Sequence, residues 1–145
     1  MDVTGIPFNR LIDILQPAGE DRALRLDFRD DLKNHLGTLH GSAQFALAEA
    51  CSGLTLHRCF PHLTDSVLPV LRKSDVKFRS PARSAVQARG DIDVETKERF
   101  ERQFERKGRA GISVSVDLTD QDGTVTMSGT FEWFVQRLDE STPTD

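Results

Sequence analysis

One stretch of this sequence, residues 38–57, carries almost no charge, although 29% of all residues are charged. The stretch reads TLHGSAQFALAEACSGLTLH, and Glu49 is its single Asp, Glu, Lys or Arg. A helix that is apolar or small on all sides is normally buried, whereas a surface helix keeps one charged face. We therefore predict a central buried helix from Gly41 to about His57, around which the rest of the chain packs.

Glu49 is the feature of this helix that points to chemistry. Glutamate is rarely buried unless it is paired or has a function. Removal from water would raise its pKa above the value of about 4.3 for a free glutamate, which suits a general base. A second interpretation stays open, in which Glu49 points out through a gap in the sheet or pairs with a structural arginine.

The start of the helix is a second candidate site element. Residues 34–42 (NHLGTLHGS) predict a loop that leads into a helix, with Gly37 and Gly41 allowing unusual torsions or close backbone approach. The free amides of a first helical turn can hold a developing negative charge. By itself, however, a glycine before a helix is ordinary.

The spacing of Gly41 and Glu49 predicts the assembly state. Eight positions along a helix correspond to about 12 Å, which is too far for both residues to act on one carbonyl group. Two helices packed antiparallel would bring each Glu49 close to the Gly41 of a second copy, which gives two equivalent sites. The site, if real, therefore requires a homodimer.

The other segments predict one sheet wrapped on this helix. Alternating apolar residues indicate strands at 23–28, 67–78, 84–92, 112–118 and 124–134. Apolar residues at helical spacing indicate a short helix at 8–15 and an amphipathic helix at 94–109. Asp120 and Gly123 suit a hairpin turn, and Pro69 suits an edge strand. The expected fold class is α+β.

Composition limits the function classes. The 145 residues fit a single domain, with its core at about 22–136 and a polar C-terminal tail at 139–145. A net charge of −4 argues against binding nucleic acid, and no apolar run approaches the roughly 20 residues of a membrane span. With no recognisable secretion signal and with Cys51 and Cys59 too far apart on a helix for a disulfide, we expect a cytoplasmic protein.

Several weaker signals in the sequence have a structural interpretation. Cys51, His57, Cys59 and His62 match no common zinc spacing, so no metal site is predicted. Trp133 and Phe134 are expected in the core or at an interface. Cationic residues near the end of the second helix could meet phosphates, but a solvated helix face is the commoner arrangement; they are Arg102, Arg106, Lys107 and Arg109.

The segment NHLGTLHGSAQFALAE resembles the hotdog-fold thioesterases of the PaaI-like and tetrameric acyl-CoA thioesterase type. In that motif an Asn is followed by His-Gly-Gly and then by an Asp or Glu about fifteen residues after the Asn. Asn34 and Glu49 have this spacing, and His40-Gly41 falls at the matching place. The strand end FRSPA (78–82) and the last hairpin are also similar, so the resemblance covers roughly residues 22–136.

The resemblance implies a hotdog fold and hydrolysis of acyl-CoA or acyl-carrier thioesters at a homodimer interface, with dimers that can pair into homotetramers. It implies that Glu49 is the base or nucleophile, that the Gly41 amide polarises the thioester carbonyl, and that Asn34 orients water or substrate. His40 would support the loop, and His40 and Ser42 are candidate substrate-binding residues. Ser66 is a further candidate substrate-binding residue, from the next strand. No cofactor is implied beyond the coenzyme A of the substrate.

The chain departs from the family pattern in two places. Ser42 replaces the second glycine of the motif, which could narrow the space for the thioester, and the helix at 94–109 is longer than the fold needs. Two alternatives remain open: an enoyl-thioester hydratase on the same fold, and a non-catalytic acyl-CoA-binding module. The sequence leaves the acyl group unidentified.

Overall fold

The charge-poor segment forms α2, Gly41–Cys59, a helix of 19 residues at the centre of the molecule. His40 caps it: the Nδ1 atom of its ring accepts the Ser42 backbone N–H at 3.0 Å. Most α2 side chains are buried, including Leu47, Ala48 and Cys51, which have no exposed surface. The prediction of a central buried helix is thus confirmed, because so few charged groups on α2 oppose its burial.

The structure is a computed structural model that describes residues 2–138. The polar tail expected at 139–145 lies outside these residues. The other elements are η1 Val3–Gly5, α1 Pro7–Leu11, β1 Ala23–Leu26, η2 Asp30–Leu32, η3 Pro61–Leu63, β2 Val67–Phe78, β3 Val86–Asp91, α3 Val94–Lys107, β4 Arg109–Thr119 and β5 Val125–Arg137.

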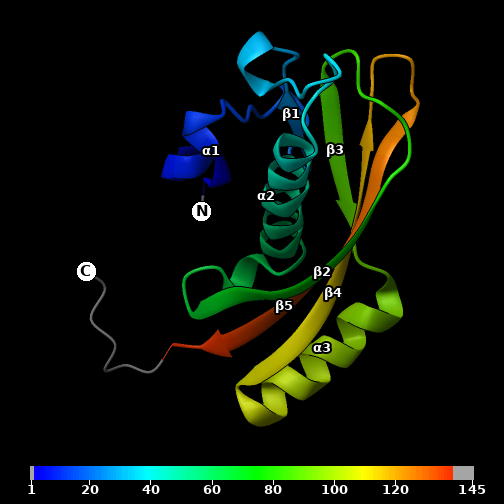
Figure 1. Ribbon diagram of the computed structural model, residues 1–145. Coiled ribbons are helices and arrows are strands. Elements are labelled where there is room, and N and C mark those ends of the chain that lie inside the picture. Colours follow the sequence, from blue (N-terminus) through cyan, green and yellow to red (C-terminus); the bar gives the residue numbers. More distant parts are fainter. Residues whose placement is uncertain (1, 139–145) are drawn as a thin grey trace.

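The five strands form one antiparallel sheet in the order β1-β3-β4-β5-β2, which packs on α2 (Figure 1). The burial pattern of β4 explains why the sheet packs on α2 with one face. Every second residue from Ala110 to Leu118 is buried, and the residues between them are exposed. A strand with this alternation covers a core with one face only. The α+β arrangement predicted from the sequence is therefore the one observed.

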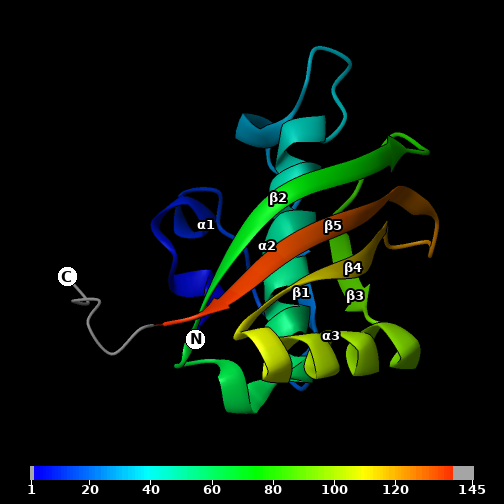
Figure 2. The same ribbon diagram turned by 90° about the horizontal axis from the view of Figure 1, so that it is seen from below.

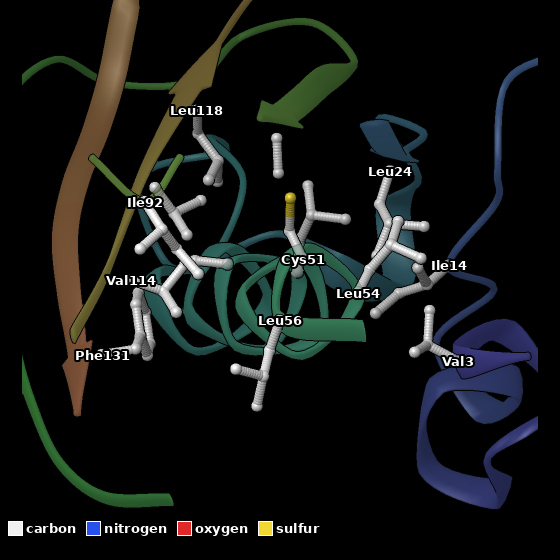
Figure 3. Close-up of a cluster of buried hydrophobic side chains, with 14 of the residues drawn as sticks. Val3, Ile14, Leu24, Cys51, Leu54, Leu56, Ile92, Val114, Leu118 and Phe131 are labelled. Carbon is white, nitrogen blue, oxygen red and sulfur yellow. The ribbon is translucent and has the colours of Figure 1, made fainter. Parts of the chain in front are cut away.

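The core lies between α2 and the elements on either side of it. Figure 3 shows Leu118, Val114 and Phe131 of the sheet on one side of α2, and Leu24, Ile14 and Val3 on the other. The N-terminal segment with α1 lies beside α2 on the side away from most of the sheet (Figures 1 and 2). This placement gives α2 a second neighbour besides its own sheet.

The first helix is shorter than the sequence analysis predicted. The apolar spacing predicted a helix at 8–15, but α1 ends at Leu11. Asp13 adopts a left-handed conformation (φ 61°), and Leu15 exchanges two backbone hydrogen bonds with Arg25 of β1. A helix cannot continue through residues whose backbone groups are taken by a strand, so tertiary pairing overrides the local pattern.

The second helix, α3, follows its local signals closely. Asp93 accepts the Thr96 backbone N–H at 2.8 Å and so caps the start of α3. The last residue of α3 is Lys107, two residues before the predicted end at 109, and Gly108 caps the helix in a left-handed conformation. Phe100 and Phe104 are buried, and the Phe100 ring lies 4.8 Å from that of Phe60. The helix α3 therefore covers the core beside Phe60, at the end of α2.

The hairpin between β4 and β5 is the one that its residues predicted. The Asp120 carboxylate accepts the backbone N–H groups of Asp122 and Thr124 at 3.0 and 2.9 Å. Gly123 has a φ of 80°, a conformation that favours glycine. The prediction of an edge position for Pro69 is also confirmed, since β2 pairs only with β5 among the described strands.

Candidate functional site

Glu49 lines a cavity of about 360 Å³ at the middle of α2. Its lining residues come from α2, β2, β5 and the N-terminal segment. Its lining consists of Val3, Ile6, Phe8, Asn9, Glu49, Ala50, Gly53, Leu56, His57, Leu68, Pro69 and Trp133. Most of these side chains are apolar. The volume and the apolar lining with few polar groups are typical of small-molecule sites.

The carboxylate of Glu49 is half-buried and has no hydrogen-bond or ion-pair partner within residues 2–138. Burial raises the pKa of Glu49, because the charged form loses contact with water. The alternative in which Glu49 pairs with a structural arginine is not observed in these residues. An unpaired carboxylate beside an apolar cavity is an arrangement often found at functional sites.

A chain of two hydrogen bonds holds the turn of α2 that carries Glu49. The Ser52 hydroxyl donates to the Glu49 backbone carbonyl at 2.7 Å. The indole N–H of Trp133, on β5, donates to the Ser52 hydroxyl at 3.0 Å. Gly53 lies beside the indole: a Cβ atom there would be in ordinary van der Waals contact with the Trp133 ring, at 3.7 Å. The sheet therefore fixes the position of the Glu49 backbone.

His57 lies on the same wall as Glu49, two helical turns further along α2. Burial lowers its pKa, so the ring is predominantly neutral near pH 7. Its Nδ1 atom lies 3.4 Å from the Thr64 hydroxyl. The cavity thus contains a carboxylate and a neutral imidazole, which are the two commonest groups for proton transfer.

The predicted loop before α2 is held together by Asn34. Its side-chain oxygen accepts the backbone N–H groups of Leu36 and Thr38, and its amide donates to the Thr38 hydroxyl at 2.9 Å. Gly37 completes the turn with a φ of 71°. The Asn34 side chain is therefore engaged within its own loop, and its suggested role on water or substrate stays a prediction.

Gly41 is the first residue of α2 and lies against Phe78, the last residue of β2. A Cβ atom at Gly41 would come within 3.2 Å of the Phe78 ring, which explains the need for a small residue there. The Gly41 N–H donates no hydrogen bond within residues 2–138, whereas the next amide is taken by His40. A free amide at a helix start is available to an anion or a polarised carbonyl.

His40 and Ser42, the other two candidate residues, line a second cavity near the start of α2. His40 and Ser42 belong to a hollow of about 280 Å³ with Phe8, Ile12, Asp31, Leu32, Lys33, Ala43 and Ala46. Ser66 lies elsewhere: its hydroxyl donates to the Leu63 carbonyl at 3.1 Å, in the turn before β2. It does not line the Glu49 cavity. Within one chain, Glu49 therefore lines one cavity, whereas His40 and Ser42 line another.

Sequence reasoning missed most of the lining of the Glu49 cavity, including Trp133, His57 and Phe8. Trp133 was expected in the core or at an interface, His57 was considered only as a metal ligand, and Phe8 only as part of a short helix. All three line the cavity. For His57, its position eight residues after Glu49 on one helix was a usable signal.

Within residues 2–138 no three His, Cys, Asp or Glu side chains gather closely enough to hold a metal ion. In the same residues no helix has the length and apolar character needed to cross a membrane.

Solved structures with the same fold extend over nearly the whole chain. A protein of unknown function and probable thioesterase from Pseudomonas aeruginosa superimposes with a TM-score of 0.77 and 23% identity, covering 94% of this chain and 91% of that one. A thioesterase from Haemophilus influenzae gives a TM-score of 0.72 and 18% identity, covering 97% and 90%. At these identities the likeness shows the fold alone, and it is the hotdog fold that the sequence resemblance implied.

A third structure carries a ligand. A Bacillus halodurans protein solved with CoA superimposes with a TM-score of 0.68 and 21% identity, covering 88% of this chain and 74% of that protein.

No curated protein matches this chain in sequence. A family model, described as "Domain of unknown function (DUF4442)", matches residues 11–135. The chain therefore belongs to the DUF4442 family, on a hotdog fold.

Proposed function

We propose that this protein hydrolyses acyl-CoA or acyl-carrier thioesters, with Glu49 as the acting carboxylate. The observation that carries the proposal is the unpaired, half-buried carboxylate of Glu49 in an apolar cavity, with a raised pKa. Structural neighbours described as thioesterases, and one solved with CoA, support the same substrate class. A thioester carbonyl is electrophilic enough for one base or nucleophile and one polarising group to suffice.

In the general-base route, the Glu49 carboxylate takes a proton from a water molecule as that water attacks the thioester carbon. The carbonyl oxygen becomes an oxyanion, which the free amide at the start of α2 stabilises. The carbon–sulfur bond then breaks, and the CoA sulfur leaves with the proton that Glu49 received. In the nucleophilic route, the Glu49 carboxylate attacks the thioester carbon, the carbon–sulfur bond breaks and CoA leaves as its thiolate, which takes a proton from water. Water then hydrolyses the resulting acyl anhydride, releases the acid and restores the Glu49 carboxylate.

Both routes require the Gly41 amide of a partner subunit, because Gly41 and Glu49 of one chain are about 12 Å apart along α2. The open edge of β2 offers a way to bring them together. Its outer backbone groups are unpaired in the described sheet, and half-exposed Leu68, Val70 and Phe78 lie along it. A long, exposed and apolar edge strand is a site where a second chain can pair.

The ends of β2 match the two halves of the proposed site. Pro69 lines the Glu49 cavity, and Phe78 contacts Gly41. Antiparallel pairing of two β2 strands, centred between Lys73 and Ser74, would set Pro69 opposite Phe78 of the partner subunit. Each Glu49 cavity would then lie beside the partner subunit's Gly41, and two equivalent sites would form about the twofold axis.

The test is CoA release from a panel of acyl-CoAs by the wild type, Glu49→Gln and Gly41→Pro. We expect Glu49→Gln to lower kcat by about 10²–10⁴-fold, the usual contribution of a general base. Gly41→Pro removes the amide proton at a first helical position where proline is well tolerated. Because its ring also reaches toward Phe78, Gly41→Ala, which adds the Cβ atom but keeps the amide, is the matched control. Gly41→Pro should lower kcat by about 10²–10³-fold. A Glu49→Gln enzyme with the wild-type rate would remove Glu49 from the mechanism.

A second candidate, hydration of enoyl-thioesters, is favoured by one observation. His57 and Glu49 line the same cavity, and this chemistry commonly uses a carboxylate with a histidine. The two reactions give different signals, since hydration removes the absorbance of an enoyl-CoA without releasing CoA. Tight binding with neither signal would instead indicate an acyl-CoA-binding module.

A further inference from the structure

Phe8 lines both cavities along α2. It lines the Glu49 cavity together with Ile6 and Asn9, and it lines the second cavity together with Ile12. Among the described residues, Phe8 is the one side chain common to both linings. The Phe8 side chain, on α1, thus borders both the cavity of Glu49 and the hollow at the start of α2.

The floor beneath both cavities is the same face of α2. Ala43 and Ala46 line the second cavity, and Ala50 and Gly53 line the first. From Ala43 to Gly53 the helix rises about 15 Å. These side chains are small, so the two cavities follow one another along the same face of α2, and Phe8 is the residue that they share.

Phe8 is held in place by its neighbours rather than by its own burial. The buried Asn9 side chain donates to the Val3 carbonyl at 2.8 Å, and the Asn9 carbonyl accepts the Ile14 N–H at 2.9 Å. The Phe8 side chain itself is 56% exposed. A residue that is fixed by its neighbours but contributes little to the core can be changed without loss of the fold.

We propose that Phe8 is the wall that limits the length of the acyl group, and that the preferred substrates are uncharged aliphatic acyl thioesters of about six to ten carbons. This inference rests on the proposed function. Glu49 is the only formally charged side chain in the cavity lining described above, so a charged acyl tail would lose its hydration without compensation.

The chain length follows from the size of the cavity. At roughly 30 Å³ for each water-sized group, 360 Å³ holds about a dozen non-hydrogen atoms, including those of the thioester. The second cavity has about 280 Å³. Its lining includes the charged Asp31 and Lys33, but Ile12, Leu32, Ala43 and Ala46 offer an apolar path along α2. Removing the wall would join the two cavities along this path and admit a chain of roughly twice that length.

The test compares Phe8→Ala with Leu11→Ala on a series of saturated acyl-CoAs from four to sixteen carbons. Leu11 lies on the same helix, is 74% exposed and lines neither cavity, so it controls for a general loosening of α1. Each additional buried methylene contributes a factor of about four to binding. The ratio of kcat/KM for hexadecanoyl-CoA to that for octanoyl-CoA should rise at least tenfold in Phe8→Ala.

The same series is titrated against Glu49→Gln, with and without Phe8→Ala, to obtain acyl-CoA affinities that do not depend on turnover. The preference should shift toward long chains in this background too. Phe8→Leu should give a smaller shift and replaces the alanine variant if that protein is unstable. Leu11→Ala should keep the wild-type profile.

An unchanged chain-length profile in Phe8→Ala, or an equal shift in Leu11→Ala, would overturn the assignment of Phe8 while leaving thioester hydrolysis intact. Absence of CoA release by the wild type would overturn the proposed function instead. In that case, a shift of the acyl-CoA affinities toward longer chains in Phe8→Ala would still support Phe8 as the wall. Affinities with an unchanged chain-length preference would reject it.

Discussion

At the scale of single residues, the environment of Glu49 decides its chemistry. Burial in an apolar cavity raises its pKa, and no hydrogen bond or cation within residues 2–138 counteracts this effect. The folded protein therefore binds a proton at Glu49 more tightly than the unfolded chain does. The charged form, which the proposed reaction needs, is held at a cost in stability.

This cost makes a prediction about Glu49→Gln, whose amide resembles the protonated acid. The contribution of Glu49 to stability is fully present below its unfolded pKa and is lost as pH rises through the raised folded pKa. Glu49→Gln should thus be more stable than the wild type at pH 7, and this advantage should disappear as the pH falls toward 4. Thermal unfolding across this pH range measures it.

Glu101→Gln, on the exposed face of α3, is the matched control for that measurement. Its stability difference from the wild type should stay small and nearly constant over the same pH range. A Glu49→Gln advantage that grows at low pH would contradict the assignment of desolvation as the cause.

The two cysteines should differ sharply in reactivity, which matters for any assay that detects released thiols. Burial raises the pKa of the Cys51 thiol to about 12, whereas Cys59 is partly exposed. Because the thiolate is the reactive form, a thiol reagent should modify one cysteine per chain in the native protein and two in denaturant. Rapid modification of both native thiols would show that α2 opens readily.

At the scale of elements, the sheet rests closely on α2 where β3 crosses it. A Cβ atom at Gly90 would overlap the Thr55 hydroxyl, which donates to the Cys51 carbonyl at 2.8 Å. The glycine lets β3 approach the helix, and the core around it has no room for an added methyl group. A single absent side chain thus sets the distance between two elements.

Gly90→Ala should therefore lower the free energy of unfolding by about 1–3 kcal/mol, the usual cost of overpacking a core. Gly111→Ala, in the neighbouring strand β4, is the control. Its nearest neighbour, the Trp133 carbonyl, would lie 3.9 Å from the new Cβ atom, so stability should change little. Urea unfolding of both variants gives the comparison; equal stabilities would mean that Thr55 rotates away without cost.

At the scale of the whole molecule, the proposed site is complete only in a dimer. One chain offers a cavity with Glu49 and, at the other end of β2, a free amide at Gly41. Two copies related by a twofold axis along the β2 edge would complete each other. A monomer would retain both halves of the site and assemble neither.

Mixing two inactive variants tests this directly. Glu49→Gln and Gly41→Pro subunits, exchanged in equal amounts, form heterodimers in which one of the two sites has both intact groups. Since half of the dimers are then mixed, about a quarter of the wild-type activity should return. A mixture of Glu49→Gln with Glu49→Ala is the control and should stay inactive. No recovery after proven exchange would mean that each site uses one chain.

Local patterns in the sequence were sufficient for most of the elements. The bounds of β2 agree residue for residue with the prediction at 67–78, and α2 begins at the predicted Gly41. The turn at Asp120 and Gly123 also follows from residue chemistry alone. Periodicity, capping and turn preferences are properties of neighbouring residues, so a single sequence contains them.

The site was predicted only in part, because cavities depend on distant segments. Glu49 is recognisable as the one charge in its helix, but Phe8 lies 41 residues before it and Trp133 lies 84 residues after it. Nothing local in either segment indicates that both reach the same cavity. Ser66, in contrast, is near α2 in the sequence and still points into its own turn.

The sequence alone thus determined the central helix, its lone carboxylate and most of the strands, since each depends on the spacing of residues close together in the chain. Only the tertiary structure decided where α1 ends, which side chains enclose Glu49 and that the edge of β2 is open. These features arise when segments far apart in the sequence pack together, and the free energy of that packing is shared by residues with no local relation.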